Sequence, residues 1–153
     1  MTYIKQISLL LVVSIVFSGC ASKPSDPQED IKNSMQVMRS AVIETVKDEE
    51  RQQKLIILTQ SLETTLAEYN LAYSSFASEF GKLNRIYDTP REKLEKLLES
   101  FRRTRKDAMN QAMDIHFKMV AQTSADEWRH IVKQELKAFE SVRESRLLQQ
   151  GGQ

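Results

Sequence analysis

A heptad row of apolar side chains constrains the fold of this chain more than any other feature. The row advances in alternating steps of four and three residues, and its members are Leu62, Leu66, Tyr69, Tyr73, Phe76, Phe80, Leu83 and Tyr87. This spacing places all members on one side of a helix and is typical of helices that pack along their length. Because the row is rich in aromatic rings, we expect it to be wide and to contact more than one neighbouring helix.

Stop and start signals follow this row. Asp88-Thr89-Pro90 predicts that one helix ends near Tyr87 and that the next begins at Pro90, with Thr89 as its N-cap and Glu92 completing a capping box. So short a link makes the two helices antiparallel. The second helix repeats the rhythm, with Arg105 as its single charged member and with Leu94, Leu98, Phe101, Ala108, Ala112, Ile115 and Met119 as its apolar row.

A further helix is expected on each side of this pair. Ser124 to Glu127 forms a second capping box, and the helix after it fades near Leu148 and carries Trp128, Val132, Phe139 and Val142. Residues 29–47 are also periodic, but residues 47–54 contain no apolar side chain and no Gly or Pro. Two interpretations therefore stay open here: one helix of about sixty residues that runs to roughly 90 Å, or a tight turn that makes four helices.

The composition agrees with a helical chain. Four Gly and three Pro in 153 residues are too few for a fold of strands and turns. We predict an all-α fold, an elongated antiparallel bundle of coiled-coil hairpins with three to four helices.

The start of the chain indicates export. Ile7 to Phe17 is an apolar run interrupted only by two serines, and as a helix it would span roughly 17 Å, well short of the ~30 Å core of a bilayer. It therefore predicts the central apolar region of a signal peptide. The segment Phe17-Ser18-Gly19-Cys20 resembles the lipobox of bacterial lipoproteins, and Cys20 is the only cysteine.

The lipoprotein resemblance implies a location and a division of the chain. It implies cleavage before Cys20, acylation of that residue, and anchoring by several acyl chains. Ala21 stands where a retention signal would have Asp, which implies the outer membrane of a Gram-negative bacterium, with the domain facing the periplasm. We expect a signal peptide at 1–19, the lipidated cysteine and a tether at 20–28, a helical domain at 29–148 and a disordered tail at 149–153.

The inventory of chemical groups argues against an enzyme. The only histidines are His116 and His130, without a catalytic triad or a nucleotide-binding glycine motif, so we expect no catalytic residues and no cofactor. Across an antiparallel hairpin the two imidazoles would lie at the same height. With Met113 and Met119 they form a hypothetical metal site, for which core packing is the plainer interpretation. The net charge of +1 gives no field that would attract nucleic acid.

One segment is locally basic. Arg102, Arg103, Arg105 and Lys106 place four cations in five positions. They predict contact with lipid phosphates, an anionic lipid surface or an acidic partner, or else a solvated face paired with neighbouring carboxylates. The aromatic row between Tyr69 and Phe80 is likewise either core or a groove for apolar segments of other proteins.

The architecture resembles the periplasmic helical-hairpin group that includes the Spy-type chaperones, whose Leu-Thr-x-x-Gln repeats have Leu58-Thr59-Gln60 as their nearest match here. We expect a non-catalytic module that binds another envelope protein as an adaptor or structural spacer, and a homodimer stays open. The alternatives are an envelope-stress chaperone, which the resemblance implies, and a metal sensor.

Overall fold

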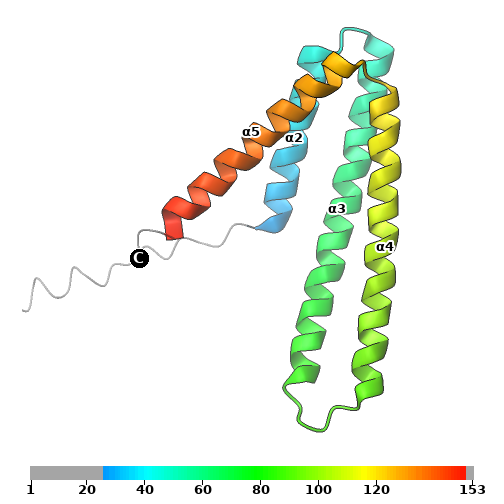
Figure 1. Cartoon of the computed structure of the whole chain (residues 1–153), viewed down its shortest axis with the longest axis vertical. Coiled ribbons are helices and arrows are strands. Elements are labelled where there is room, and N and C mark those ends of the chain that lie inside the picture. Colours follow the sequence, from blue (N-terminus) through cyan, green and yellow to red (C-terminus); the bar gives the residue numbers. More distant parts are fainter. Residues whose placement is uncertain (1–25, 151–153) are drawn as a thin grey trace, which may run out of the picture. The chain divides into compact units, whose positions relative to one another are not determined.

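The computed structural model describes residues 26–150, with side chains for 26–137 and 140. In this range the chain forms the helices α2 (Pro27–Thr45), α3 (Glu49–Asn84), α4 (Arg91–Ala121) and α5 (Ala125–Gln150), and no strand (Figure 1). The predicted all-α helical bundle is confirmed. Cys20, the signal peptide and most of the tether lie outside the described residues, as do the last three residues of the tail. Ser25–Glu140 forms one compact unit.

The long helices α3 and α4 lie side by side as an antiparallel hairpin (Figure 1). The aromatic row of α3 faces α4 through Phe101, whose ring stacks on Phe76 with centroids 4.2 Å apart and meets Tyr69 at 6.2 Å and Tyr73 at 6.0 Å. Offset stacking of this kind adds about 0.5–1.5 kcal/mol to the burial of the rings. The predicted packing row is therefore the contact between the two helices.

The buried core lies where α2 and α5 join this hairpin. Its members come from all four helices and the first turn between them, and they are Met35, Met38, Ala41, Val42, Val46, Leu55, Ile115, Met119 and Ile131. Two threonines of α3 are also buried, and each donates its hydroxyl to a carbonyl one turn earlier: Thr59 to Leu55 and Thr65 to Ser61. The core therefore contains no hydroxyl of α3 without an acceptor.

The uncertain segment at 47–54 is a turn followed by a helix. The break falls at residues 46–48, where Val46 enters the core and Asp48 accepts a hydrogen bond from the backbone N–H of Arg51 at 2.8 Å. This is the N-cap geometry that starts α3. The four-helix interpretation is thus confirmed over the described residues.

The two outer boundaries of the predicted helical domain need correction. The helix α2 begins at Pro27, inside the predicted tether, because Asp26 caps it and Gln28 donates to the carbonyl of Ala67 at 3.1 Å. At the other end of the chain, α5 continues to Gln150, two residues into the predicted tail.

The hairpin turn also differs from the expectation. Thr89 does not cap α4, since its hydroxyl donates to the carbonyl of Leu83 at 2.6 Å and so completes the end of α3. The helix α3 ends at Asn84, before the last member of its row, and Tyr87 is fully exposed. Within the described part of the chain, no helix is both long enough and apolar enough to cross a membrane.

Candidate interaction surface

The turn between α4 and α5 is held by the predicted capping box. The backbone N–H of Ser124 donates to the Glu127 carboxylate at 2.7 Å, and the N–H of Glu127 donates to the Ser124 hydroxyl at 3.3 Å. Arg51, at the start of α3, adds a forked pair of hydrogen bonds to the same carboxylate at 2.9 and 3.1 Å, and donates to the carbonyl of Gln122 at 3.1 Å. One arginine thereby ties the start of α5 to the start of α3.

This contact changes the acidity of the carboxylate. The hydrogen bond from Arg51, followed by that from the Ser124 backbone, lowers the pKa of Glu127 from 4.5 to about 2. On the same helix, burial raises the pKa of Glu135 above its ordinary value. The first carboxylate is therefore charged wherever the protein is folded near neutral pH, and the second is held in surroundings that disfavour its charge.

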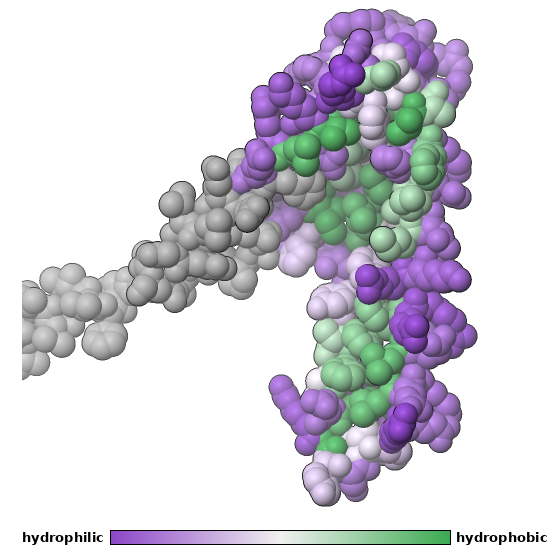
Figure 2. Space-filling view, viewed as in Figure 1, coloured by the Kyte–Doolittle hydropathy of each residue, from purple (hydrophilic) through white to green (hydrophobic). Residues whose placement is uncertain are grey.

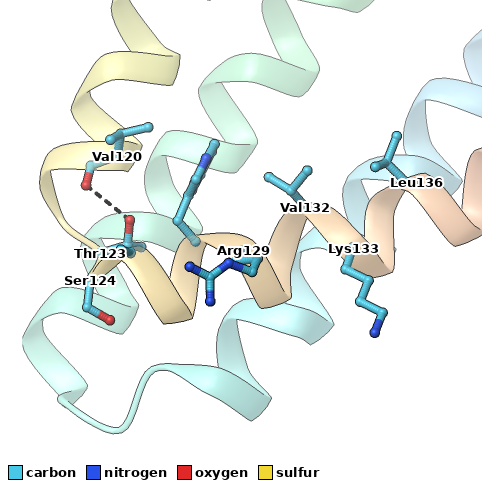
Figure 3. Close-up of a pocket in the computed structure, with 9 residues that line it drawn as sticks. Val120, Thr123, Ser124, Arg129, Val132, Lys133 and Leu136 are labelled. Atoms are coloured by element: carbon cyan, nitrogen blue, oxygen red, sulfur yellow. Dashed lines mark hydrogen bonds between the residues drawn. The ribbon is translucent and has the colours of Figure 1, made fainter.

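A broad apolar groove runs along the first half of α5 (Figure 3). It encloses about 750 Å³, and its floor includes Val120, Trp128, Val132 and Leu136. In Figure 3 Val132 and Leu136 point to the same side of α5, while Lys133 points away from them. Arg129 and Lys133 also line this groove, and Arg129 is paired with the carboxylate of Asp126 at 2.7 Å.

The groove continues onto a row of side chains along α4. The row advances in steps of four, three, four, three and four residues, and its members are Arg102, Lys106, Met109, Met113, His116 and Val120. We call it the outer row of α4. Met109 is 60% exposed, Met113 49%, and the neighbouring Phe117 60%. Figure 2 shows hydrophobic surface along α5 and down the hairpin, bordered by hydrophilic residues.

The predicted basic patch forms one end of the outer row. Arg102 and Arg103 share a single carboxylate, that of Glu99, each at 3.9 Å. No ion pair is recorded for Arg105 or Lys106 within residues 26–140. A hollow of about 500 Å³ is lined by all four cations together with Met109, so the patch and the apolar surface are continuous.

The four residues of the hypothetical metal site lie in different surroundings. His116 meets the ring of Trp128 edge-on, with centroids 5.2 Å apart, and His130 lies two positions further along α5, about 200° around that helix from Trp128. Met119 is 1% exposed in the core, whereas Met113 is open to solvent. Within the described residues, no group of three or more His, Cys, Asp or Glu could hold a metal ion.

The aromatic row between Tyr69 and Phe80 is engaged rather than open for most of its length. Phe76 contacts both Phe101 and Phe80, and Tyr69 stacks on Phe101, whereas Tyr73 is 51% exposed. Of the two interpretations of this row, the contact with α4 supports the structural one.

Comparison with protein-family models, with curated proteins and with solved structures finds no match to this chain. Sequence reasoning missed both the outer row and the Arg51–Glu127 contact. The outer row of α4 could have been found in the sequence, because its spacing is as regular as that of the row in α3.

Proposed function

We propose that this chain is a non-catalytic protein-interaction module of the bacterial envelope, anchored to the outer membrane through acyl chains on Cys20 and facing the periplasm. The location rests on the resemblance of Phe17-Ser18-Gly19-Cys20 to a lipobox and on Ala21 after it. The interaction role rests on the surface of α4 and α5.

The observation that carries the interaction role is the continuity of exposed apolar side chains across two helices. Met109, Phe117 and Leu136 are each more than half exposed, and the outer row of α4 runs into the groove of α5. Soluble monomers seldom leave such a surface uncovered, and a polar border around one is typical of a protein-binding site. Most of the groups that line it are apolar or cationic, with Thr123 and Ser124 in the groove and Glu99 and Asn110 beside the basic patch, and this lining suits binding rather than proton transfer or nucleophilic attack.

The turn between the two helices supports this role because hydrogen bonds tie it to the start of α3. The capping box and the Arg51 fork fix the start of α5 with four hydrogen bonds, and Arg51 adds a fifth to the carbonyl of Gln122 at the end of α4. A surface fixed in advance loses less conformational entropy on binding.

The experiment is crosslinking in intact cells with a lysine-reactive reagent on the full-length chain, followed by mass spectrometry of the adducts. A single partner at a fixed ratio supports the proposal. A broad range of unfolded envelope proteins would overturn it in favour of the chaperone alternative. Self-crosslinks alone would overturn both and establish a homodimer. The metal-sensor alternative gains nothing from the position of His116 against Trp128.

The anchor is tested separately by labelling cells with radioactive palmitate and fractionating their membranes. Cys20→Ser should abolish the label and release the chain, whereas Ser18→Ala, which keeps a small residue before the cysteine, should retain both label and membrane. Ala21→Asp should move the protein from the outer to the inner membrane. A chain that stays unlabelled with Cys20 intact would refute the lipoprotein assignment.

A further inference from the structure

We propose that the outer row of α4 is the docking site for an amphipathic helix of a partner protein, and that this helix carries acidic residues at the end that meets Arg102 and Lys106. This inference rests on the proposed interaction role, and adds the position, the form and the charge of what is bound.

The form of the partner follows from spacing. The outer row has the alternating steps of four and three that place side chains along the seam of paired helices. It is a second seam, because the row containing Phe101, Ile115 and Met119 already faces α3 and the core. Successive positions on a helix differ by 100°, so the outer row, whose members each follow a position of that row by one residue, is turned from it by this angle. Met109 lies at the border between the two, since it also lines a hollow beside Leu66 and Tyr69 of α3.

The described part of the chain covers only one end of this second seam. Trp128 of α5 packs on His116, and Val120 lines the α5 groove. Below them Met109 and Met113 remain 60% and 49% exposed. From Arg102 to Val120 the row spans about 27 Å of helix, which is room for a partner helix of five turns.

The charge of the partner follows from the lower end of the row. Arg102 and Lys106 occupy seam positions, where a partner helix would remove them from water. The hollow beside them is lined by four cations and one carboxylate, Glu99, whose two contacts are long at 3.9 Å, and Asp107 follows Lys106 in the chain. Burying unpaired cations is costly, and carboxylates on the partner remove that cost. Complementary charge also fixes the direction in which the partner helix lies.

A second copy of this chain fits the row less well than an acidic partner. In antiparallel self-pairing Met109 would face Met113, but Lys106 would then face His116 and Arg102 would face Val120. In parallel self-pairing each cation would face its own copy, and like charges at this distance repel each other. A membrane surface also fits less well, because helices that lie on membranes carry cations beside the apolar face along its length, and here they gather at one end of it.

The test places the photo-crosslinking residue benzoylphenylalanine at position 113 of the full-length chain in living cells. The matched control has it at Gln111, which is exposed on the same helix and two positions, about 200°, away from Met113. After irradiation the crosslinked peptide is identified by mass spectrometry. We expect position 113 and not position 111 to capture a peptide with apolar residues at helical spacing and an excess of Asp and Glu.

Charge reversal then tests the direction. Arg102→Glu with Lys106→Glu should lower the crosslinking yield at position 113 about tenfold, since two attractive pairs become repulsive. Changing the partner's facing carboxylates to Lys should restore it. These exposed substitutions leave the core untouched, and circular dichroism of the purified variant verifies its fold.

The outcomes separate this inference from the proposed function. A partner found by the lysine-reactive reagent, with no adduct at position 113, leaves the interaction role standing and refutes the docking site. An adduct with lipid, with a second copy of this chain or with a peptide free of acidic residues also refutes it. No partner by either method refutes both.

Discussion

Ile131 is the residue on which the attachment of α5 can be measured, because it is the only described side chain of that helix in the buried core, with 0% exposure. Ile131→Ala removes three carbon atoms, whose transfer accounts for about 2.4 kcal/mol. The remaining cavity raises the expected loss in unfolding free energy to about 3 to 4 kcal/mol. This is a large part of the roughly 5–15 kcal/mol that stabilises a typical domain.

The assay uses urea unfolding of residues 20–153 carrying Cys20→Ser, followed by two signals. Trp128 is the only tryptophan and lies against His116, so its fluorescence reports whether α5 is attached. Circular dichroism reports helix content in the whole chain. In Ile131→Ala we expect the fluorescence midpoint to fall further than the dichroism midpoint, because α5 leaves before the α3–α4 hairpin melts.

The control for this experiment is Leu136→Ala, on the same helix and 57% exposed. Its unfolding free energy should stay within about 0.5 kcal/mol of the parent. A loss below about 1 kcal/mol in Ile131→Ala, or an equal loss in both variants, would show that α5 is not held by this contact.

Three further predictions concern single contacts. Glu127 has a lowered pKa of about 2 against an ordinary 4.5, so the stability it contributes is present above pH 4.5 and is lost as the pH falls toward 2. Glu127→Gln should lower the melting temperature at pH 7 and flatten its dependence on pH in that window, and parallel curves for parent and variant would contradict this. Burial raises the pKa of Glu135, so the cost of its charge to folding begins as the pH rises above the ordinary 4.5 and is complete above the raised value. Glu135→Gln should therefore raise the melting temperature at pH 7 and leave it unchanged below pH 4, and an equal gain at both would contradict the assignment. Asp48→Ala removes the N-cap of α3 and should cost about 1 kcal/mol in urea unfolding. Asp107→Ala, inside α4 and exposed, should cost nothing.

The features predicted correctly from the sequence were those fixed by local spacing. The row that includes Tyr69 and Phe76 fixed the pairing of α3 with α4, because a heptad row has one favourable face whatever the rest of the chain does. The capping box of Ser124 and Glu127 was correct for a similar reason, since both partners lie within one turn. The break before α3 had a signal too, because Asp48 followed by two glutamates is a strong helix start.

What failed depended on contacts between distant residues. Thr89 has the sequence context of an N-cap, yet the hydroxyl finds a nearer acceptor in the carbonyl of Leu83, which only the closed hairpin brings within 2.6 Å. Arg51 and Glu127 are 76 residues apart in the chain, and nothing local pairs them. The equal height of His116 and His130 followed from the expected antiparallel hairpin and stays a prediction. The rotation of α5, which turns Trp128 toward His116, decides the contact instead.

The surface on α4 was divided between two hypotheses, a metal site and a basic patch, because Met119 was grouped with the wrong row. Met113 and His116 were grouped with Met119, as ligands of a hypothetical metal site, and the basic patch was interpreted alone. Met119 lies one step short of Val120 and belongs to the core. When Val120 replaces Met119 in the row, its steps alternate regularly between four and three residues. The row then extends toward the start of α4 through Lys106 to Arg102. The two hypotheses then describe one surface.

An ordinary amphipathic helix has one seam and packs against one neighbour. The helix α4 has two seams and therefore offers a face to a second neighbour. One seam of α4 is filled by α3 and the core, and α5 covers the other only as far as His116. If the second seam existed to complete the fold of a single chain, cations at Arg102 and Lys106 would weaken it, because each would have to be buried without a carboxylate. Those same cations disfavour a second copy of this helix and favour an acidic partner helix. The residues that would weaken this seam inside a core therefore make it selective as a binding surface.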